Sequence, residues 1–392
     1  MLRDGLRTIV LVAGAATAGV LGWSGQALML PASLAFPALW SLAPSRVSAA
    51  LVSAAYFLAA SRGLPRGVTA FYRSDIGPGL ILWLISSTGF VAVHALLWSG
   101  RGDGRKALNY LTAMLLLAVP PLGIVGWAHP ITASGIIFPG CGWLGLGAMS
   151  FGLAVMTTRG RAAVAVVVIG LWILSAIRWP SPDPGQDWPS GWQAVSLDLG
   201  MSLGRDPTLA RHRELASVVR SRRLPGGLVM VLPESALGFW TPTLERLWQQ
   251  QLAGSGLTVI AGAAIVGAEG YDNVLLRISE HDSEILYYER MPVPGSMWQP
   301  WRFFTGQKGG ARAFFFANPV AVVAGRRIAP LICYEQLIIW PVIQSMLYHP
   351  DVIVAVGNGW WTRGTNIVAI QQASALAWSR LFAKPLILSF NL

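Results

Sequence analysis

A cysteine ends an apolar run in the C-terminal third of the chain, and a carboxylate follows it two residues later. The apolar run is 327–332, the cysteine is Cys333 and the carboxylate is Glu335. The chain has only two cysteines, so this thiol belongs neither to a disulfide framework nor to a multi-thiolate metal site. Backbone N–H groups at a turn from strand to helix stabilise a thiolate and, later in a reaction, an oxyanion. The pattern therefore favours a nucleophilic thiol; the alternative is a buried cysteine that closes a core strand.

Two further polar sites follow predicted strands. Glu234 comes after the apolar run 227–232 and a proline, and an Asn-Gly-Trp-Trp motif at 358–361 comes after the run 351–356. Ligand sites in α/β proteins gather beyond the carboxyl ends of strands, so these groups and Cys333 are expected to converge. Glu234 would then be the general base for the thiol, with a pKa raised by burial. The alternative is a carboxylate in a surface turn.

The elements that must position these residues differ between the two halves of the chain. Residues 1–178 are apolar with short basic stretches, whereas most acidic side chains come after residue 180. Charged residues make up only 12% of the sequence, which is too few for a typical wholly soluble protein. We therefore predict a multi-span α-helical membrane domain at 1–178, followed by one soluble domain.

Seven apolar segments are candidate membrane spans, although several are shorter than the roughly 20 residues that a straight span requires. They cover residues 8–21, 27–42, 47–60, 77–98, 108–127, 134–156 and 162–177. Basic residues mark the cytoplasmic side of a membrane protein. With the N-terminus inside, the cytoplasmic side collects Arg3, Arg7, Arg46, Arg101, Arg105, Lys106, Arg159 and Arg161, and the outer side collects Arg62, Arg66, Arg73 and Arg178. This asymmetry predicts a multi-pass protein of a bacterial inner membrane, with its soluble domain facing the periplasm.

The net charge of +11 is explained better by this topology than by a nucleic-acid surface. No stretch interleaves basic and aromatic side chains as nucleic-acid-binding surfaces do, so we expect no direct contact with nucleic acid. The 18 tryptophans are expected to serve membrane interfaces and pocket walls.

The soluble domain is predicted to begin after a linker at 179–190, because prolines at alternate positions block helix and strand alike. In the domain itself, 191–392, short apolar runs alternate with helical patterns. The predicted strands are 193–199, 227–232, 257–266, 273–278, 285–288, 320–323, 327–332, 351–356 and 385–390, and the predicted helices are 207–222, 242–253, 336–347 and 367–382. Such alternation indicates an α/β layered domain with sheets covered by helices.

Three motifs in this domain resemble those of the nitrilase, or carbon–nitrogen hydrolase, superfamily. They are Pro233-Glu234, Ile332-Cys333-Tyr334-Glu335 and Asn358-Gly359-Trp360-Trp361. Membrane spans ahead of such a domain resemble the apolipoprotein N-acyltransferase branch, and the stretch 291–301 looks closer to a plasmid-encoded conjugal-transfer branch. The resemblance implies a nitrilase-like αββα sandwich. It also implies a domain that is truncated at its C-terminus relative to the family, which would leave the last strand near an open edge.

The chemistry of this family implies a Glu–Lys–Cys triad, in which the cysteine attacks an ester or amide carbonyl. By resemblance, Cys333 is the nucleophile, Glu234 is the base that removes and returns the proton, and Glu335 is an additional carboxylate beside the nucleophile. The resemblance implies neither a metal nor a cofactor.

The lysine of the triad has no counterpart at its expected position. A few residues before a Val-Pro pair, where the family has its lysine, this chain has Glu289 and Arg290. Arg290 supplies positive charge and forked donors, but it cannot shuttle a proton. The other candidate cation is Lys308, in a glycine-rich loop; the alternative is that it is an ordinary exposed lysine.

The resemblance also implies a substrate site beside Tyr334, Asn358, Trp360 and Trp361. An acyl chain from the bilayer would extend this pocket along four further aromatic side chains, namely Trp298, Trp301, Phe303 and Phe304. The alternative is that these aromatic residues are core or interfacial anchors. Candidate substrates are a membrane lipid or lipoprotein, and candidate partners are conjugation-apparatus proteins.

These observations lead to one leading prediction and two alternatives. We predict a Cys-dependent acyltransferase or amidase that acts through a thioester on Cys333. The first alternative is a catalytically silent membrane scaffold of a plasmid conjugation or envelope assembly. The second is a periplasmic amidase for a small soluble substrate.

The second cysteine, Cys141, falls within the predicted span 134–156. A thiolate is costly in apolar surroundings. We therefore expect Cys333 to be the reactive thiol and Cys141 to be inert.

Overall fold

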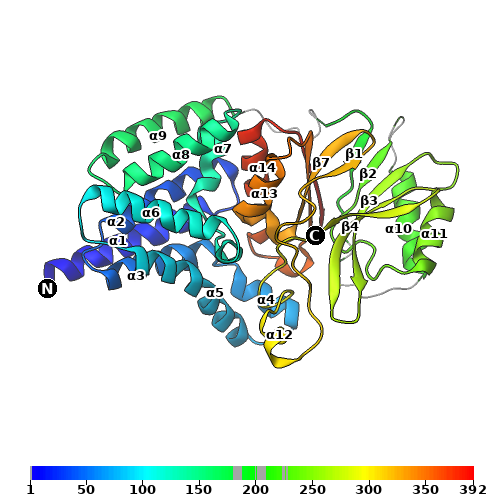
Figure 1. The fold of residues 1–392 in the computed structure, drawn as a ribbon, viewed down its shortest axis with the longest axis horizontal. Coiled ribbons are helices and arrows are strands. Elements are labelled where there is room, and N and C mark those ends of the chain that lie inside the picture. Colours follow the sequence, from blue (N-terminus) through cyan, green and yellow to red (C-terminus); the bar gives the residue numbers. More distant parts are fainter. Residues whose placement is uncertain (1, 180–187, 199, 201–208, 223–225, 227) are drawn as a thin grey trace. The chain divides into compact units, whose positions relative to one another are not determined.

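The computed structural model describes residues 2–179, 188–198, 200, 209–222, 226 and 228–392 (Figure 1). The chain forms two compact units that are not contiguous in sequence. The helical unit comprises Met1–Pro182, Leu337–Trp340 and Gly364–Ala383, and the sheet unit comprises Asp183–Gln336, Pro341–Arg363 and Lys384–Leu392. This division differs from the predicted domains, 1–178 and 191–392, because the helical unit also takes two later segments. Most of the predicted linker, 179–190, lies outside the described residues.

The helical unit is built from short and long helices. They are α1 (Leu2–Gly22), η1 (Ala27–Ala35), α2 (Phe36–Ser41), α3 (Arg46–Ala60), α4 (Leu64–Tyr72), α5 (Ile76–Leu97), α6 (Asp103–Ala118), η2 (Leu122–Val125), η3 (Pro130–Ala133), α7 (Ser134–Ile137), α8 (Gly142–Met156), α9 (Arg161–Ile177) and α14 (Ile367–Phe382). Among the described residues, two helices are long and apolar enough to cross a membrane, α1 from Arg3 and α5. The pair α3 and α4, bent by 52°, would add a third if it forms one span.

The other predicted spans form shorter helices, and in two of them prolines or glycines interrupt the helix. The predicted span 108–127 ends as a helix at Ala118, just before Pro120 and Pro121. The predicted span 134–156 is divided into α7 and α8 by a Pro139-Gly140 break. The structure thus supplies two or three helices of spanning length within its described part, where the sequence predicted seven.

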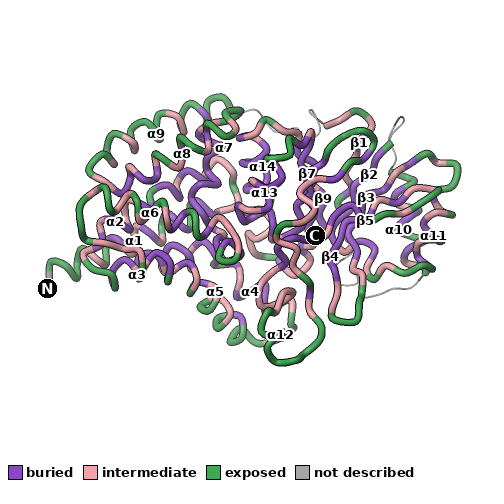
Figure 2. The backbone as a smooth tube through the Cα atoms, in the orientation of Figure 1, coloured by how far each residue is buried: buried purple, intermediate pink, exposed green. Residues whose placement is uncertain are grey.

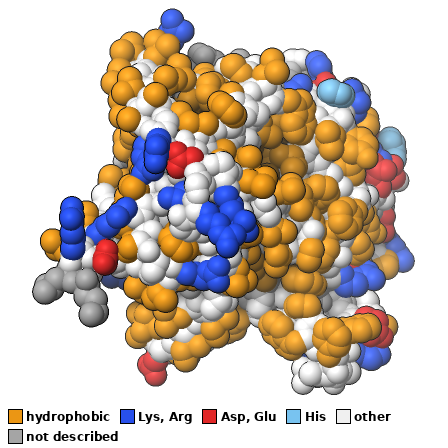
Figure 3. Space-filling model, turned by 60° about the vertical axis from the view of Figure 1, so that its left-hand side comes forward, with side chains coloured by type: hydrophobic (Ala, Val, Ile, Leu, Met, Phe, Trp, Pro, Cys, Tyr) orange, Lys and Arg blue, Asp and Glu red, His pale blue; other side chains and the backbone are white. Residues whose placement is uncertain are grey.

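Many apolar side chains of the helical unit face outward. Figure 3 shows a face on which hydrophobic side chains predominate and basic side chains gather in small groups. Strongly exposed examples are Leu6, Ile9, Val10, Leu51, Ile81, Leu84, Ile85, Leu96, Leu144, Phe151, Val166 and Ile177. An apolar surface of this extent is typical of a contact with lipid or with another protein.

Helix α14 is packed among the helices of the N-terminal part, although it lies in sequence between two strands of the sheet unit. A Cβ atom added at Gly135 of α7 would meet the carbonyl oxygen of Ala377 at 1.6 Å, so the two backbones touch. A Cβ added at Gly25 would likewise approach the Cβ of Ala369 to 2.5 Å. Small residues permit this approach, and they make α14 an integral part of the helical unit.

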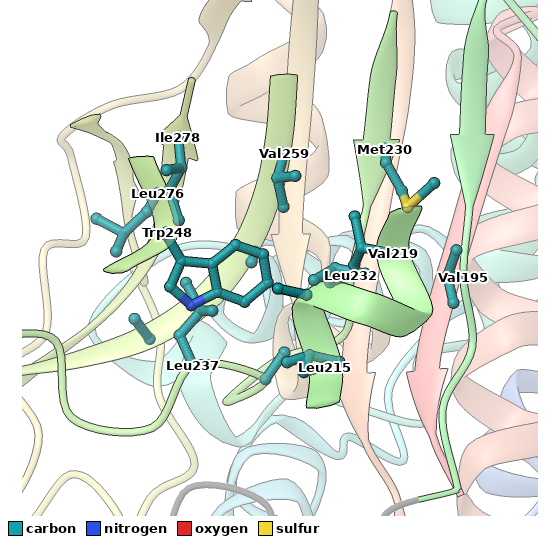
Figure 4. Close-up of a cluster of buried hydrophobic side chains, with 14 of the residues drawn as sticks. Val195, Leu215, Val219, Met230, Leu232, Leu237, Trp248, Val259, Leu276 and Ile278 are labelled. Carbon is teal, nitrogen blue, oxygen red and sulfur yellow. The ribbon is translucent and has the colours of Figure 1, made fainter. Parts of the chain in front are cut away.

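The first sheet of the sheet unit has five strands in the order β1-β2-β3-β4-β5. The strands are β1 (Trp192–Ala194), β2 (Val229–Val231), β3 (Thr258–Val266), β4 (Tyr271–Ile278) and β5 (Ser283–Tyr288). β1, β2 and β3 are parallel, whereas β4 and β5 are antiparallel to their neighbours. Helices α10 (Leu209–Ser221) and α11 (Pro242–Leu252) supply Leu215, Val219 and Trp248 to the core on one face of this sheet (Figure 4).

The second sheet has four strands in the order β6-β7-β8-β9. The strands are β6 (Ala321–Val323), β7 (Arg326–Ile332), β8 (Val352–Asn358) and β9 (Leu386–Asn391), with the short helices α12 (Trp301–Thr305) before them and α13 (Ile339–Met346) among them. A core of side chains from both sheets, including Val231, Ile260, Ile328 and Val354, fills the space between them. The strands of the two sheets are mostly buried (Figure 2). The predicted strands are confirmed within two residues at each end, with one exception. The strand predicted at 193–199 is shorter, since β1 ends at Ala194, and residue 199 lies outside the described residues.

The outer edge of β9 is not open, which corrects the expectation from the sequence. Leu197 donates its backbone N–H to the carbonyl oxygen of Phe390 and accepts from the N–H of Leu392, both at 2.9 Å. Ser389 adds a side-chain hydrogen bond to the carbonyl oxygen of Val195 at 2.8 Å. The segment that follows β1 therefore pairs with β9 and protects it.

Candidate active site

Cys333 lies directly beyond the end of β7 in a strained backbone conformation. Its φ of +45° is in the left-handed region, and the residue opens the short turn η5 (Cys333–Leu337). Such a conformation is uncommon for a residue with a side chain and often marks a functional site. The thiol is buried, with 7% of the residue exposed. The register pairs Ile332 with Val356, which places Asn358 and Cys333 at the same edge of the sheet.

Glu234 lies beyond the end of β2, next to Ser235, which also has a left-handed backbone with φ +58°. The carboxyl group is buried, and burial raises its pKa to about 7. Hydrogen bonds from Asn273, from the Cys333 thiol and from the Asn358 backbone oppose that rise. The structure therefore brings together the two residues that the sequence assigned as nucleophile and base.

Glu335 is held by hydrogen-bond donors on all sides. It accepts from the Tyr287 hydroxyl at 2.7 and 2.8 Å, from the backbone N–H groups of Arg290 at 2.7 Å and Ile332 at 2.8 Å, and from Met291 at 3.3 Å. Burial raises the pKa of Glu335, while Arg290 and these donors oppose the rise. Because every contact comes from a donor, the geometry is that of an ionised carboxylate.

Arg290 is fully buried, and its side chain is engaged by other groups. Its Nε donates to the Tyr287 hydroxyl at 2.8 Å, Nη1 to Gln344 Oε1 at 2.8 Å and Nη2 to Ser345 Oγ at 2.9 Å. Its Nε also lies 4.0 Å from Glu335 Oε1. Arg290, predicted as a cationic catalytic element, is thus placed where it fixes Glu335 and the loop around it.

Lys308 lies on the surface of the sheet unit. Its side chain is 67% exposed, and its Nζ forms an ion pair at 2.9 Å with Glu269, which is 71% exposed. The glycine-rich loop does not carry this lysine into a buried site, and the alternative reading of an exposed lysine fits the structure.

Glu289 and Asn273 complete the buried polar cluster, and neither was assigned a role from the sequence. The Nδ2 atom of Asn273 donates to Glu234 Oε1 and to Glu289 Oε2, both at 2.9 Å. Glu289 is only 1% exposed, and its other oxygen, Oε1, has no hydrogen-bond partner among the described residues. Burial, followed by the charges of Glu234 and Glu335, raises the pKa of Glu289 well above its usual value.

Gly262 of β3 permits the close approach of the Glu234 backbone. A Cβ atom at this position would lie 2.5 Å from the Glu234 Cα and 2.6 Å from the Ser235 nitrogen. The backbone N–H of Gly262 donates to the Pro233 carbonyl oxygen at 3.1 Å. A glycine inside an apolar strand is the sequence signal that marks such a contact.

The predicted substrate-contacting residues lie at and just beyond the ends of β7 and β8. Tyr334, Trp360 and Trp361 are half-buried. The Asn358 side chain accepts from Asn391 Nδ2 at 2.9 Å, and its carbonyl oxygen accepts from Trp361 Nε1 at 3.0 Å. Asn358 therefore also ties β8 to β9.

The predicted acyl-chain lining is only partly supported. Trp298 packs edge-on against Phe315 with ring centres 5.5 Å apart. Helix α12 exposes the other three predicted aromatic residues, Trp301 by 48%, Phe303 by 88% and Phe304 by 84%. The two phenylalanines therefore lie on the surface of the sheet unit.

Cys141 is also placed differently from the prediction. It precedes α8 as its N-terminal cap residue and is exposed, whereas Cys333 is buried. The break between α7 and α8 brings this thiol to a helix end instead of a span interior. Labelling experiments on Cys333 therefore require a variant that lacks Cys141. In the described part of the chain, no group of three or more His, Cys, Asp or Glu side chains is arranged to hold a metal ion.

Comparison with known proteins identifies the family. Residues 58–380 match the family model of the carbon-nitrogen hydrolases. The chain belongs to the carbon–nitrogen hydrolase family. This confirms the resemblance drawn from the three motifs and the nitrilase-like fold of the sheet unit.

Two curated relatives of this family member are similar along their whole length. The chain is 58% identical over 391 residues to the probable conjugal transfer protein TraB of Sinorhizobium fredii, with all of both chains covered. It is 54% identical over 401 residues to the conjugal transfer protein TraB of Agrobacterium fabrum, with 100% of this chain and 94% of the relative covered.

Solved structures of the family are more distant. An amidase from Nesterenkonia sp. is 14% identical, with a TM-score of 0.32 over 43% of this chain and 65% of the amidase. A carbon-nitrogen hydrolase from Helicobacter pylori is 12% identical, with a TM-score of 0.36 over 50% of this chain and 72% of that enzyme.

Proposed function

We propose that this carbon–nitrogen hydrolase family member is a membrane-anchored thiol acyltransferase or amidase of conjugal transfer, with Cys333 as its nucleophile. The observation that carries this proposal is the burial of Cys333 and Glu234 beyond the ends of β7 and β2, where the thiol is among the groups that lower the pKa of the Glu234 carboxyl group. A nucleophile within hydrogen-bond reach of a general base is the arrangement that covalent catalysis requires. The curated relatives are named for conjugal transfer, which supports that setting.

The proposed reaction has two half-reactions. Glu234 removes the thiol proton while the Cys333 sulfur forms a bond to the carbonyl carbon of an ester or amide. The bond from that carbon to oxygen or nitrogen then breaks, Glu234 returns the proton to the leaving alcohol or amine, and a thioester remains on Cys333. An amine or water attacks the thioester in the second half-reaction, and its proton passes through Glu234 back to the thiol.

The first test is thioester formation on purified full-length protein in detergent, in a Cys141→Ser background. We expect a short activated ester to acylate Cys333, with a mass increase that hydroxylamine reverses. Glu234→Gln should slow acylation about 10²–10⁴-fold, the usual contribution of a general base. Because Glu234 must be ionised to act as the base, the rate should rise with pH through about 7.

The control for this test is Glu269→Gln, which alters a carboxylate that is 71% exposed. It should acylate at the wild-type rate. Acylation at another residue, or an unchanged rate in Glu234→Gln, would contradict the proposed roles. A phospholipid, a lipopeptide and a small amide, used in parallel as acyl donors, would show whether the substrate is a lipid or a small amide.

We further propose a bacterial inner-membrane location with the sheet unit in the periplasm. The two helices of spanning length, the outward apolar side chains and the distribution of basic residues support this orientation. A periplasm-dependent reporter fused after Arg178 should be active, and the same reporter fused after Arg161 should be inactive. The reverse result would place the sheet unit in the cytoplasm.

A silent scaffold is the second candidate function, and one observation favours it. Among the described ion pairs, none supplies a cation to Glu234 or Glu289, although the family's triad includes a lysine. Plasmid transfer from a strain that lacks this protein distinguishes the two functions. Complementation by Cys333→Ser at the wild-type level would support the scaffold, and failure to complement at equal protein abundance would support the enzyme.

A further inference from the structure

The charge balance of the buried cluster leaves two carboxyl groups without a counter-ion. The guanidinium of Arg290 lies 4.0 Å from Glu335, and Glu335 has further donors around it. These two charges therefore offset each other. Glu234 and Glu289 take part in no ion pair among the described residues, and both are at least 95% buried. Two uncompensated negative charges in such a site are strongly disfavoured.

The Asn273 amide holds these two carboxyl groups together. Its single nitrogen donates one N–H to each, at 2.9 Å in both cases. One oxygen of each carboxyl group therefore lies within hydrogen-bond distance of the same nitrogen, and ionising both groups would bring two buried negative charges close together. One of the two must therefore keep a proton.

The surroundings decide which carboxyl group keeps it. Glu234 has two further donors, the Cys333 thiol and the Asn358 backbone, and these favour its ionised form. Within the described part of the chain, the Glu289 carboxyl group accepts a hydrogen bond from Asn273 alone. It also lies near the acidic Glu234 and Glu335 and near the Tyr271 hydroxyl of β4. Each of the two carboxyl groups has one oxygen without a hydrogen-bond partner among the described residues, Oε2 of Glu234 and Oε1 of Glu289. Because the further donors beside Glu234 favour its ionised form, the proton is expected on Oε1 of Glu289. A protonated carboxyl group is a hydrogen-bond donor.

We propose that Glu289 keeps a proton throughout the reaction and donates it as a hydrogen bond from Oε1 to the carbonyl oxygen of the substrate. This inference rests on the proposed function. The carbonyl electron pair moves to oxygen when the Cys333 sulfur attacks and returns when the leaving group departs, while the proton stays on Glu289. A neutral acid in an apolar site can stabilise an oxyanion in this way. It would take the place of the lysine that the family uses.

Two substitutions at Glu289 distinguish a role as hydrogen-bond donor from a role as negative charge. Glu289→Gln keeps a neutral donor of similar shape, so the acylation rate should stay within about fivefold of wild type and its pH midpoint should not move. Glu289→Leu removes the donor and should lower the rate about 10²–10³-fold, the usual loss for one oxyanion donor. If Glu289 is instead ionised, Glu289→Gln removes a repelling charge, and the pH midpoint falls by a unit or more. That result would overturn the proposal.

The protonation state of Glu289 can be measured without an activity assay, so this inference can be tested separately from the proposed function. Infrared spectra of the full-length protein are recorded about two pH units above the Glu234 pKa of about 7, where Glu234 is ionised. They should contain a protonated-carboxyl band that is lost in Glu289→Gln and retained in Glu269→Gln. If the band is lost in Glu234→Gln but not in Glu289→Gln, the proton lies on Glu234, which would overturn the inference. Absence of the band from the wild-type protein would overturn it as well. If wild type forms no thioester but shows the Glu289 band, the proposed function fails, and with it the donor role, while the proton assignment holds.

Discussion

At the scale of the residue, Arg290 lies where the family has its catalytic lysine, but its contacts stabilise the structure around Glu335. Its three nitrogens bind Tyr287, Gln344 and Ser345, and its charge offsets Glu335. The neighbouring residue, Glu289, shares the Asn273 amide with Glu234. Two residues stand where the family has its lysine. The acidic one, Glu289, therefore lies beside the proposed base, and the basic one, Arg290, supports the turn that carries the proposed nucleophile.

Removing Arg290 should consequently destabilise the protein. Arg290→Ala leaves Glu335 as a buried charge without its counter-ion, a change that typically costs about 3–5 kcal/mol. Denaturant unfolding of the sheet unit, followed by tryptophan fluorescence in detergent, measures this loss. Lys308→Ala is the control, and as an exposed substitution it should change stability by less than about 0.5 kcal/mol. Normal stability of Arg290→Ala combined with slow acylation would show that the guanidinium acts directly on the substrate.

At the scale of the element, the proposed catalytic residues Glu234 and Cys333 follow the ends of β2 and β7. The left-handed conformations of Ser235 and Cys333 turn the chain sharply after β2 and after β7. Gly262 of β3 provides the space for the first of these turns. The position of Glu234 therefore depends on a residue that has no side chain.

Gly262→Ala should displace Glu234 from Cys333. The added methyl group would contact backbone atoms at 2.5 and 2.6 Å, and backbone cannot move aside as a flexible side chain does. We expect acylation to fall by at least about tenfold, together with an overpacking cost of about 1–3 kcal/mol. Gly267→Ala is the matched control, because its nearest neighbour would be an oxygen at 3.7 Å. Wild-type acylation by Gly262→Ala would contradict this account of how Glu234 is positioned.

The strands and the positions of Glu234 and Cys333 were predictable because both follow from local patterns. Apolar runs of strand length ended at polar residues, and these ends meet in the fold as predicted. The Asn273 bridge was not predictable, since it depends on the pairing that brings Glu289 beside Asn273, where the Glu289 N–H donates to the Asn273 carbonyl oxygen at 2.8 Å. The engagement of Arg290 by Gln344 and Ser345 is likewise a contact across more than 50 residues of sequence.

At the scale of the whole molecule, the two units share one continuous stretch of chain near the C-terminus. β8 belongs to the sheet unit, α14 to the helical unit, and β9 to the sheet unit again. The sequence predicted α14 as a helix but could not predict its partners, because small residues such as Ala377 suit either a soluble or a membrane helix. The chain therefore forms two compact units, but no single cleavage of the chain would separate one unit from the other.

A fragment that starts at residue 188 should not form a well-behaved soluble domain. α14 would lose the helices against which Ile370, Ala373 and Trp378 are buried, and it would expose an apolar surface. Size-exclusion chromatography should show aggregates, and co-expression of residues 1–182 should reduce them. A monodisperse, folded fragment would show that α14 is dispensable to the sheet unit.

The position of α14 near the C-terminal end of the described chain also determines when each unit can finish folding during translation. Proteins are made from the N-terminus, and early segments usually fold before later ones are complete. Here the helical unit lacks one of its helices until residue 383 has been synthesised, and the second sheet lacks β9 until a few residues later. Both units are thus completed only after residue 363, so a ribosome that stalls before this point releases a chain in which neither unit is finished.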